Sequence, residues 1–238
     1  MKYQKIFRRY EFKYKITQEQ KRALINYMSD YMEPDKFGKS KICNIYFDTP
    51  DSVLIRRSLE RPMYKEKLRL RSYGRVNEDD EVFLEIKKKY DGVVYKRRIV
   101  LPEKEAMAYV CDKIEPTKQN QISREIDYFL SLYENLSPVI YVSYDREAFY
   151  AREDNDFRMT FDQNIIWRDY NLELTEDSYG ESLIDDDTVI MEIKTSKAIP
   201  LWLVNFLSEN MIYRTSFSKY GSIYKEMFAN NQINSNVV

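Results

Sequence analysis

Several short runs of this chain alternate charged and apolar residues. Side chains of a β-strand point to opposite faces with a period of two, so each run predicts a strand with one apolar and one charged face. The charged positions are mainly Lys and Arg, with a few Glu. The runs with this pattern are 9–16, 65–71, 82–89, 96–100, 157–162 and 189–194.

Turn and cap residues complete the predicted order of elements. Thr17 begins a helix with Gln20 at the capping-box position, and the apolar stripe of this helix runs to Met32. Asp91 and Gly92 predict a hairpin turn. Strands are expected at 4–16, 42–48, 64–73, 81–89, 93–101, 138–150, 156–163 and 188–195. Helices are expected within 103–136, interrupted at Pro116, from 199 onward and over 221–229.

Eight strands with one charged face match the number that closes a small β-barrel. We therefore expect an α+β fold, with an antiparallel eight-stranded barrel that has a charged interior and is flanked by helices. An open antiparallel sheet with one solvated face would produce the same alternation. No low-complexity linker interrupts the chain, so we expect a single domain over 1–228 and a flexible tail over 229–238.

The composition narrows the chemistry. The chain has 238 residues, a net charge of −1 and no histidine. The lack of histidine excludes Ser-His-Asp and Cys-His catalysis and removes the commonest zinc ligands. A metal ion would be held by carboxylates and water, which favours Mg²⁺ or Mn²⁺. Charge is segregated along the chain: 61–98 is basic, and 169–187 is acidic and is interpreted as a solvated loop.

The cysteines and apolar stretches bear on location. Cys43 and Cys111 lie in unrelated contexts and form neither a metal motif nor a disulfide framework, which predicts a reduced, cytoplasmic protein. The N-terminus does not resemble a signal peptide. The longest apolar stretch, 199–207, is too short to span a bilayer. We expect no transmembrane segment in this chain, and attachment to the inner face of a membrane through a membrane-protein partner stays open.

An E-x-K pair recurs on three predicted strands, as Glu11/Lys13, Glu85/Lys87 and Glu192/Lys194. On a strand, the two side chains of such a pair share a face about 6.6–6.8 Å apart. One pair alone is typical of a surface ion pair. Three copies indicate a mixed site, because a triphosphate with a divalent metal needs cations for its oxygens and a carboxylate for the ion.

The ordered motifs resemble one known family. The matching segments are RRYEFKYKI (8–16), NIYFDTPD (44–51), KLRLRSYG (67–74), VFLEIKKK (82–89), GVVYKRRI (92–99), PVIYVSYDREAFY (138–150), FRMTFDQNI (157–165), VIMEIKT (189–195) and SFSKYG (216–221). Together, over about residues 7–225, they resemble the VTC domain of the triphosphate tunnel metalloenzymes, a CYTH-like superfamily. The chain departs from the family pattern at Lys89, where a histidine is expected, and at Ser216, where a basic residue is expected. Tunnel phosphatases usually have a fuller E-x-E-x-K at the N-terminus, whereas this chain has Arg9 and only E-x-K.

The resemblance, together with the E-x-K pairs, assigns residues to roles. The expected catalytic residues are Lys13, Arg69, Arg71, Lys87, Arg98, Arg146, Arg158 and Lys219. The expected substrate-binding residues are Lys67, Lys96, Tyr144, Ser218 and Lys194. The expected metal ligands are Glu192, Glu85 and Glu11. Like charges along one strand repel, so Arg69→Ala is expected to abolish ligand binding at little cost in stability.

The resemblance implies a transferase. It would pass the terminal phosphoryl group of a nucleoside triphosphate (ATP) to a growing polyphosphate chain, with Mn²⁺ or Mg²⁺, inside a basic tunnel. Two alternatives remain: an inorganic triphosphatase or nucleoside triphosphatase on the same fold, and a non-catalytic polyphosphate-binding module. We do not expect nucleic acid as the partner, because glutamates on the cationic face would repel its backbone.

Overall fold

Ten strands form one antiparallel sheet in the computed structural model of the chain, which describes residues 10–60, 62–154 and 156–235. The strands are β1 (Tyr10–Thr17), β2 (Met32–Asp48), β3 (Tyr64–Tyr73), β4 (Glu81–Tyr90), β5 (Val93–Pro102), β6 (Ser137–Ala151), β7 (Arg158–Arg168), β8 (Glu181–Ser182), β9 (Thr188–Thr195) and β10 (Arg214–Thr215). The helices are α1 (Gln18–Tyr27), the 3₁₀ helix η1 (Met28–Asp30), α2 (Val53–Leu59), α3 (Glu103–Cys111), α4 (Gln121–Leu132), α5 (Leu201–Glu209) and α6 (Lys219–Ser235).

The sheet is open. Its strands follow the order β10-β1-β9-β7-β6-β2-β3-β4-β5, with β8 paired to β7, so β5 and β10 are its edges in the described part of the chain. The predicted closed, eight-stranded barrel is therefore wrong, whereas the antiparallel α+β class is confirmed. The eight predicted strands all form, and β8 and β10, of two residues each, are additional. A two-residue edge strand offers too few backbone groups to pair with the ten residues of β5.

The sheet is nevertheless strongly curved. Glu11 of β1 and Lys87 of β4 form an ion pair with 2.9 Å between Oε2 and Nζ. Five strands separate β1 from β4 in the sheet order. In a flat sheet the two strands would therefore lie about 29 Å apart, at about 4.8 Å per spacing. The sheet must curl for these side chains to meet, and the charged side chains line its concave face.

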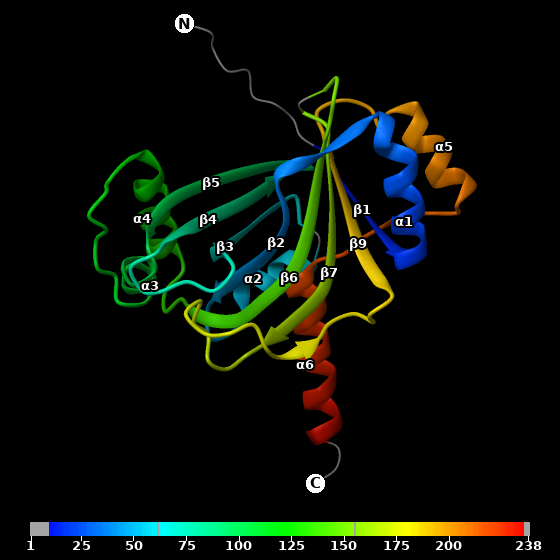
Figure 1. Cartoon of the computed structure of the whole chain (residues 1–238). Helices are drawn as coiled ribbons and strands as arrows, with labels where there is room; N and C mark the ends of the chain where they lie inside the picture. The colour runs from blue at the N-terminus through cyan, green and yellow to red at the C-terminus, as the bar shows by residue number, and fades with distance from the viewer. Residues whose placement is uncertain (1–9, 61, 155, 236–238) are drawn as a thin grey trace, which may run out of the picture.

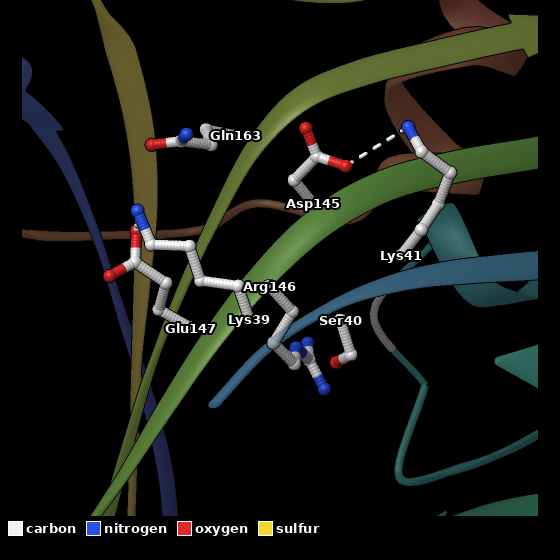
Figure 2. A pocket seen from close by; sticks show the side chains of 7 residues that line it. All are labelled: Lys39, Ser40, Lys41, Asp145, Arg146, Glu147 and Gln163. Atoms are coloured by element: carbon white, nitrogen blue, oxygen red, sulfur yellow. Dashed lines mark ion pairs between the residues drawn. The ribbon is translucent and has the colours of Figure 1, made fainter. Parts of the chain in front are cut away.

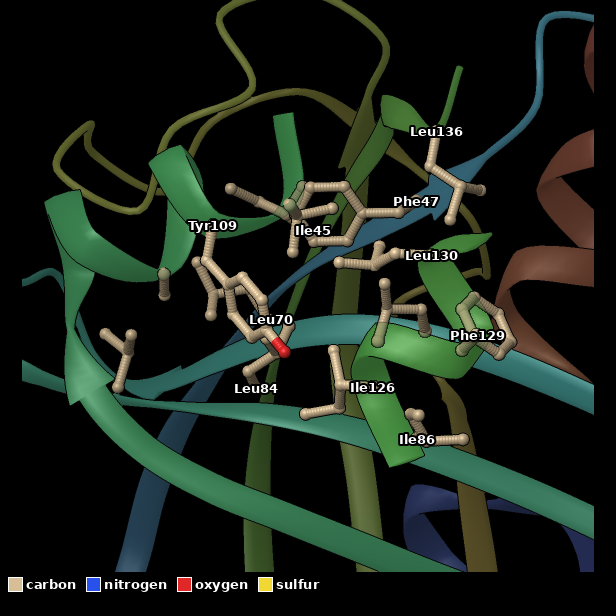
Figure 3. Close-up of a cluster of buried hydrophobic side chains, with 14 of the residues drawn as sticks. Ile45, Phe47, Leu70, Leu84, Ile86, Tyr109, Ile126, Phe129, Leu130 and Leu136 are labelled. Carbon is tan, nitrogen blue, oxygen red and sulfur yellow. The ribbon is translucent and has the colours of Figure 1, made fainter. Parts of the chain in front are cut away.

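Helices cover the convex face at both ends of the sheet. Figure 1 shows α3 and α4 beside β3, β4 and β5, and α1 and α5 beside β1 and β9. The first group encloses a core in which Ile45 and Leu84 of the sheet meet Tyr109 and Phe129 of the helices (Figure 3). The second group encloses another core, in which strand residues such as Met191 pack against the helices. The apolar positions of the alternation therefore face the helices, as predicted.

The concave face is apolar at one end. There α2 and α6 pack on the sheet, and Ile55 and Ile223 of these helices join Val142, Trp167 and other strand residues in a third core. Side-chain direction along β7 changes at Asn164, which has a positive φ of 51° and stands in a bulge opposite β6. The expected interior is thus charged over only part of its length.

Local signals were predicted well where they depend on neighbouring residues. The Thr17 hydroxyl accepts a hydrogen bond from the Gln20 amide, and the Thr17 amide donates one to the Gln20 side-chain oxygen, which is the predicted capping box. Asp91 and Gly92 both have positive φ angles, as the predicted two-residue hairpin requires. Helices α3 and α4 are separated by a segment that contains Pro116.

One helical prediction was wrong, and one helix was missed. The stripe assigned to the first helix continues to Met32, but α1 ends at Tyr27 and β2 begins at Met32. Met32 packs in the same core as Leu24 and Met28, so an apolar residue at helical spacing was mistaken for a further turn of the helix. Helix α2 was not predicted at all, and its N-terminal amides bond to the side chain of Asp48, which ends β2.

The predicted strand at 4–16 is present from Tyr10 onward, and Arg9 lies outside the described residues. Helix α6 continues to Ser235, six residues beyond the predicted end at 229. Within the described residues, no helix has both the length and the apolar character that a bilayer crossing requires.

Candidate active site on the concave face

The pairing registers gather the predicted site residues on one face. Residues directly opposite each other in paired strands share a face, and the registers join Lys13 to Glu192, Arg69 to Glu85, and Arg146 to Asp162. We call this concave set the charged face. Its members are Glu11, Lys13, Asn44, Tyr46, Lys67, Arg69, Arg71, Glu85, Lys87, Lys96, Arg98, Tyr144, Arg146, Arg158, Thr160, Asp162, Glu192 and Lys194.

The start of α6 and the residue before it add two predicted residues to this face. Lys219 places its Nζ 2.5 Å from Oδ2 of Asp162, and Ser218 places its Oγ 3.2 Å from Nζ of Lys67. Several cations of the charged face are partly open to water: the exposed fraction of the side chain is 15% for Arg69 and Arg146 and 35% for Lys87. A small anion in solution can therefore reach them.

Buried carboxylates divide the cations into groups. Asp162, fully buried on β7, accepts bidentate hydrogen bonds from Arg146 at 2.6 and 2.8 Å and a further bond from Lys219. Burial by itself would raise the pKa of Asp162, but Arg146 and Lys219 lower this pKa to about 2. Asp162 is thus ionised at neutral pH and holds both cations in place.

Glu85 plays the same part on β4. Its fully buried carboxylate pairs with Arg69 at 2.8 Å, with Lys96, and at 4.0 Å with Arg71. These cations overcome the effect of burial and lower the pKa of Glu85 to about 2. The mutual repulsion expected along β3 is therefore offset by Glu85, which lies directly opposite Arg69.

The remaining carboxylates, Glu11 and Glu192, lie near one another around Lys13. Nζ of Lys13 is 3.4 Å from Glu11 and 3.6 Å from Glu192. Glu192 also pairs with Lys194 at 2.6 Å. Burial would raise the pKa of Glu192, but Lys194, Lys13 and Lys87 hold it well below the ordinary value.

Lys67 differs from these cations because no carboxylate among the described residues pairs with it. It donates to Ser218 and lies 5.6 Å from the centre of the Tyr220 ring. Burial lowers the pKa of Lys67 to about 8. A bound anion would supply the missing negative charge.

Tyr144 lies among cations at the centre of the face. Its ring is 4.1 Å from Nζ of Lys219 and 5.2 Å from the guanidinium carbon of Arg146, and its hydroxyl accepts from Arg71 at 3.3 Å. Burial would raise the pKa of the Tyr144 phenol, but Arg146, Arg71 and Lys219 lower it to about 8.

Two predicted residues lie apart from the rest. Arg98 is exposed on the edge strand β5 and covers the Phe83 ring at 4.7 Å. Arg158 is about half exposed and pairs with Asp35. Both share the charged face by register, but within the described residues neither forms an ion pair with Asp162 or Glu192.

The metal ligands predicted from the sequence fall into two places. Glu11 and Glu192 are neighbours, whereas Glu85 pairs with Arg69, Arg71 and Lys96. In the described part of the chain no three acidic, histidine or cysteine side chains cluster as a metal site would. Mg²⁺ commonly takes one or two protein carboxylates and completes its shell with water and phosphate oxygens, so Glu11 and Glu192 are a fitting donor set.

Asp162 is the important residue that the sequence reasoning missed. It appeared as a polar position of the alternating run 157–162 and received no role. A carboxylate between two runs of cations was the available signal, because buried guanidinium groups need a counter-charge. Its partner on β6, Arg146, was predicted, but their pairing depends on the register between β6 and β7.

A separate pocket of about 250 Å³ lies mainly on the convex side of β2 and β6 (Figure 2). Lys39 and Lys41 pair with Glu147 and Asp145 there, at alternate positions to those of the charged face. Figure 2 shows Lys41 directed at Asp145. These charges balance each other, so this pocket lacks the excess of cations that marks the charged face.

The family model of the VTC domain matches residues 8–228. The chain belongs to the VTC domain family. The predicted resemblance is thereby confirmed. Vacuolar transporter chaperone complex subunit 4 of Trypanosoma cruzi (strain CL Brener) is 28% identical to this VTC domain over 155 residues, which cover 53% of the chain and 19% of that protein. The chain thus matches about a fifth of that relative's length.

Solved structures share the fold of this VTC domain. A putative adenylate cyclase from Bacillus halodurans superposes with a TM-score of 0.55 at 15% identity, over 89% of this chain and 95% of that one. A putative adenylyl cyclase from Hippeastrum, described as having a dominant triphosphatase activity, superposes with a TM-score of 0.53 at 15% identity, over 91% and 95% of the two chains. At this identity the likeness concerns the fold alone.

Proposed function

We propose that this VTC domain is a metal-dependent phosphotransferase that extends polyphosphate at the expense of ATP. The observation that carries the proposal is the charged face itself: cations from β1, β3, β4, β5, β6 and β9 converge on a concave surface with two neighbouring carboxylates. Phosphoryl transfer needs mainly positioning and charge stabilisation, and a chain without histidine can supply both.

The arginines bind the phosphate oxygens. Arg69 and Arg146 are held by Glu85 and Asp162, so their guanidinium groups need little reorganisation when an anion arrives. Lys67 brings a positive charge without a carboxylate partner in the described chain, so it adds net attraction for the triphosphate. Lys87 lies opposite Lys67, Lys96 lies opposite Lys87, and Lys194 is a further cation of the same face.

Glu192 and Glu11 would hold a divalent ion, which is Mg²⁺ or Mn²⁺ by the chemistry of the donor set. Such an ion, when bound, neutralises developing charge on phosphate oxygens. Lys13 lies between the two carboxylates and donates to the carbonyl oxygen of Phe217 at 3.0 Å. Its ammonium group would have to shift toward the substrate to leave both carboxylates free.

The reaction forms one bond and breaks one. A terminal oxygen of the polyphosphate chain attacks the terminal phosphorus of ATP, and the bond from that phosphorus to the bridging oxygen breaks, so ADP leaves. The acceptor oxygen is already anionic, so no strong base is required. We assign Lys13 and Lys219 to the positioning of the acceptor end.

Incubation of the purified protein with ATP and Mn²⁺ tests the proposal, with the products resolved on a gel. Long polyphosphate chains and ADP in matching amounts are the expected result, and Glu192→Gln should lose both. Glu125→Gln, on α4 of the convex side, is the matched carboxylate control and should retain activity. Free phosphate as the sole product would indicate the triphosphatase instead, and tripolyphosphate binding without turnover would indicate a binding module.

The surroundings of the enzyme are also proposals. We propose one domain over 1–228 and a cytoplasmic protein that a membrane-protein partner holds at the membrane. The tail predicted to be flexible from 229 onward is helical as far as Ser235. The T. cruzi relative is named as the subunit of a complex, which supports a partner. Cell fractionation followed by crosslinking should find the protein in the membrane fraction with such a partner.

A further inference from the structure

Asp48 has no part in the proposed chemistry, although it lies in a segment that carries the family resemblance. It is fully buried at the end of β2. One carboxylate oxygen accepts from the backbone amides of Thr49 and Leu54, both at 2.8 Å. The other accepts from the amide of Ile55 at 3.0 Å and from the hydroxyl of Tyr220 at 2.8 Å. Asp48 therefore joins the end of β2 to the start of α2 and to α6.

Tyr220 connects this carboxylate to the charged face. Its ring stacks on Tyr46 of the charged face, with 5.1 Å between the ring centres, and lies beneath the ammonium group of Lys67. Burial raises the pKa of the Tyr220 phenol, and the negative charge of Asp48 raises it further, so the hydroxyl remains a donor. One side of Tyr220 thus contacts a buried anchor and the other contacts site residues.

Of the three residues before Tyr220, two hold a cation of the charged face and the third supplies one. The carbonyl oxygen of Phe217 accepts from Lys13, Oγ of Ser218 accepts from Lys67, and Lys219 itself pairs with Asp162. A shift of this segment would therefore move several cations together.

The segment 217–220 and the start of α6 are closely packed against α2. A Cβ added to Gly221 would lie 3.2 Å from Cδ2 of Leu59 in α2 and 3.2 Å from Cβ of Ser218. Helices α2 and α6 thus approach closely, next to the residues that Asp48 anchors. The position of α2 and that of the segment 217–220 are linked through one carboxylate.

We propose that Asp48 and Tyr220 are positioning residues, which fix the segment 217–220 so that Lys13, Lys67 and Lys219 present their charges to a bound triphosphate. This inference rests on the proposed function, because it assumes that the charged face binds phosphate anions. Neither residue touches the anion. Their effect reaches it through the backbone and side chains of the segment.

Tyr220→Phe is the decisive variant, because Asp48→Asn would also weaken the cap of α2 and perturb folding. Tyr133→Phe is the matched control: this tyrosine also donates to a buried carboxylate at 2.8 Å, that of Glu66, but it does so on the convex side. Both variants lose one hydroxyl and one hydrogen bond of the same kind. Binding of inorganic tripolyphosphate is measured by calorimetry, and the titration of Lys67 is followed by the pH dependence of its acetylation.

We expect Tyr220→Phe to weaken tripolyphosphate binding about tenfold, as the loss of one charge-assisted contact would. We also expect the titration midpoint of Lys67 to rise, because a loosened segment admits water. Tyr133→Phe should change neither quantity. Equal losses of binding in both variants, or wild-type values for Tyr220→Phe, would overturn the proposal. Absence of tripolyphosphate binding in the wild type would contradict the proposed function instead. In that case the positioning role is judged from the Lys67 titration, and an unchanged midpoint in Tyr220→Phe would contradict it.

Discussion

Two arginines of this protein, one partly buried and one fully buried, have opposite surroundings. Arg146, on the charged face, meets its counter-charge in Asp162. Arg168, at the end of β7, is 1% exposed and lies on the convex side, between the rings of Tyr141 and Tyr179. Arg168 donates to backbone carbonyl oxygens of the chain that follows it, namely those of Tyr170, Asn171, Glu173, Asp177 and Tyr179.

The acidic stretch 169–187, predicted to be a solvated loop, is thus partly wound around one guanidinium group. Gly180 permits the loop to return closely to β7: its φ is 145°, and an added Cβ would lie 2.2 Å from the carbonyl oxygen of Trp167. The comparison teaches that burial of an arginine does not identify a ligand site. Backbone carbonyl oxygens accept hydrogen bonds from the N–H groups of Arg168, so few remain for a ligand. Arg146, in contrast, lies among further cations that attract an anion.

Arg168→Met should produce the largest effect on stability. The carbonyl oxygens that it leaves buried each lose a donor, so we expect the free energy of unfolding to fall by about 4 kcal/mol. Urea unfolding followed by circular dichroism measures this change. Tripolyphosphate binding to the folded variant should change less than about twofold, within ordinary surface effects. If the folded Arg168→Met protein no longer binds tripolyphosphate, the contrast between a structural Arg168 and a ligand-binding Arg146 is wrong.

Arg69→Ala sharpens the comparison from the side of the charged face. The sequence alone predicted little cost in stability, but the structure shows Glu85 fully buried beside Arg69. Removal of one partner from a buried pair is costly, and Lys96 and Arg71 compensate only in part, so the free energy of unfolding should fall by about 2 kcal/mol. Chemical unfolding of Arg69→Ala, Glu85→Gln and the double variant would give the coupling energy. Additive losses would show that the pair is not coupled.

Lys67→Met should separate binding from stability most cleanly. Burial of the charged Lys67 ammonium group costs free energy that no carboxylate of the described residues offsets. Its loss should therefore change the free energy of unfolding at pH 7 by less than about 1 kcal/mol. Tripolyphosphate affinity should fall about tenfold, as expected for one charge-assisted contact. Lys88→Met is the control, since Lys88 lies 3.9 Å from Glu66 on the convex side. An equal loss of affinity in the control would point to net charge rather than position.

The smallest expected effect is a dependence on pH. The pKa values of Lys67 and Lys96 are about 8 in the folded protein, below the ordinary 10.5, chiefly because of burial. Both lysines are charged below pH 8 and neutral above it, so tripolyphosphate affinity should fall about fivefold between pH 7 and pH 9. Between pH 8 and 10.5 the unfolded chain holds more protons, so these two groups raise stability as pH rises.

Calorimetry at a series of pH values checks this prediction, with Lys67→Met for comparison. The variant should show a smaller fall in affinity, because one of the two titrating groups is gone. A pH profile identical to that of the wild type would exclude Lys67 as a contributor.

Much of the candidate site could be predicted because it follows from alternation. The charged side chains of each strand stand at alternate positions and so lie on one face, as Lys13, Arg69, Lys87 and Glu192 do. Partners could not be predicted in the same way. The pairing of Arg146 with Asp162, and of Asp48 with Tyr220, joins residues that the register or the helix packing brings together.

By itself, the sequence determined what depends on near neighbours: the two faces of each strand, the Thr17 cap, the Asp91-Gly92 turn and the excess of cations on one face. Only the tertiary structure decided that the sheet stays open, that β7 changes face at Asn164, and that carboxylates neutralise part of the charge. The physical reason is that side-chain direction is set by local backbone geometry. Closure, register and counter-charge depend instead on contacts between segments far apart along the chain.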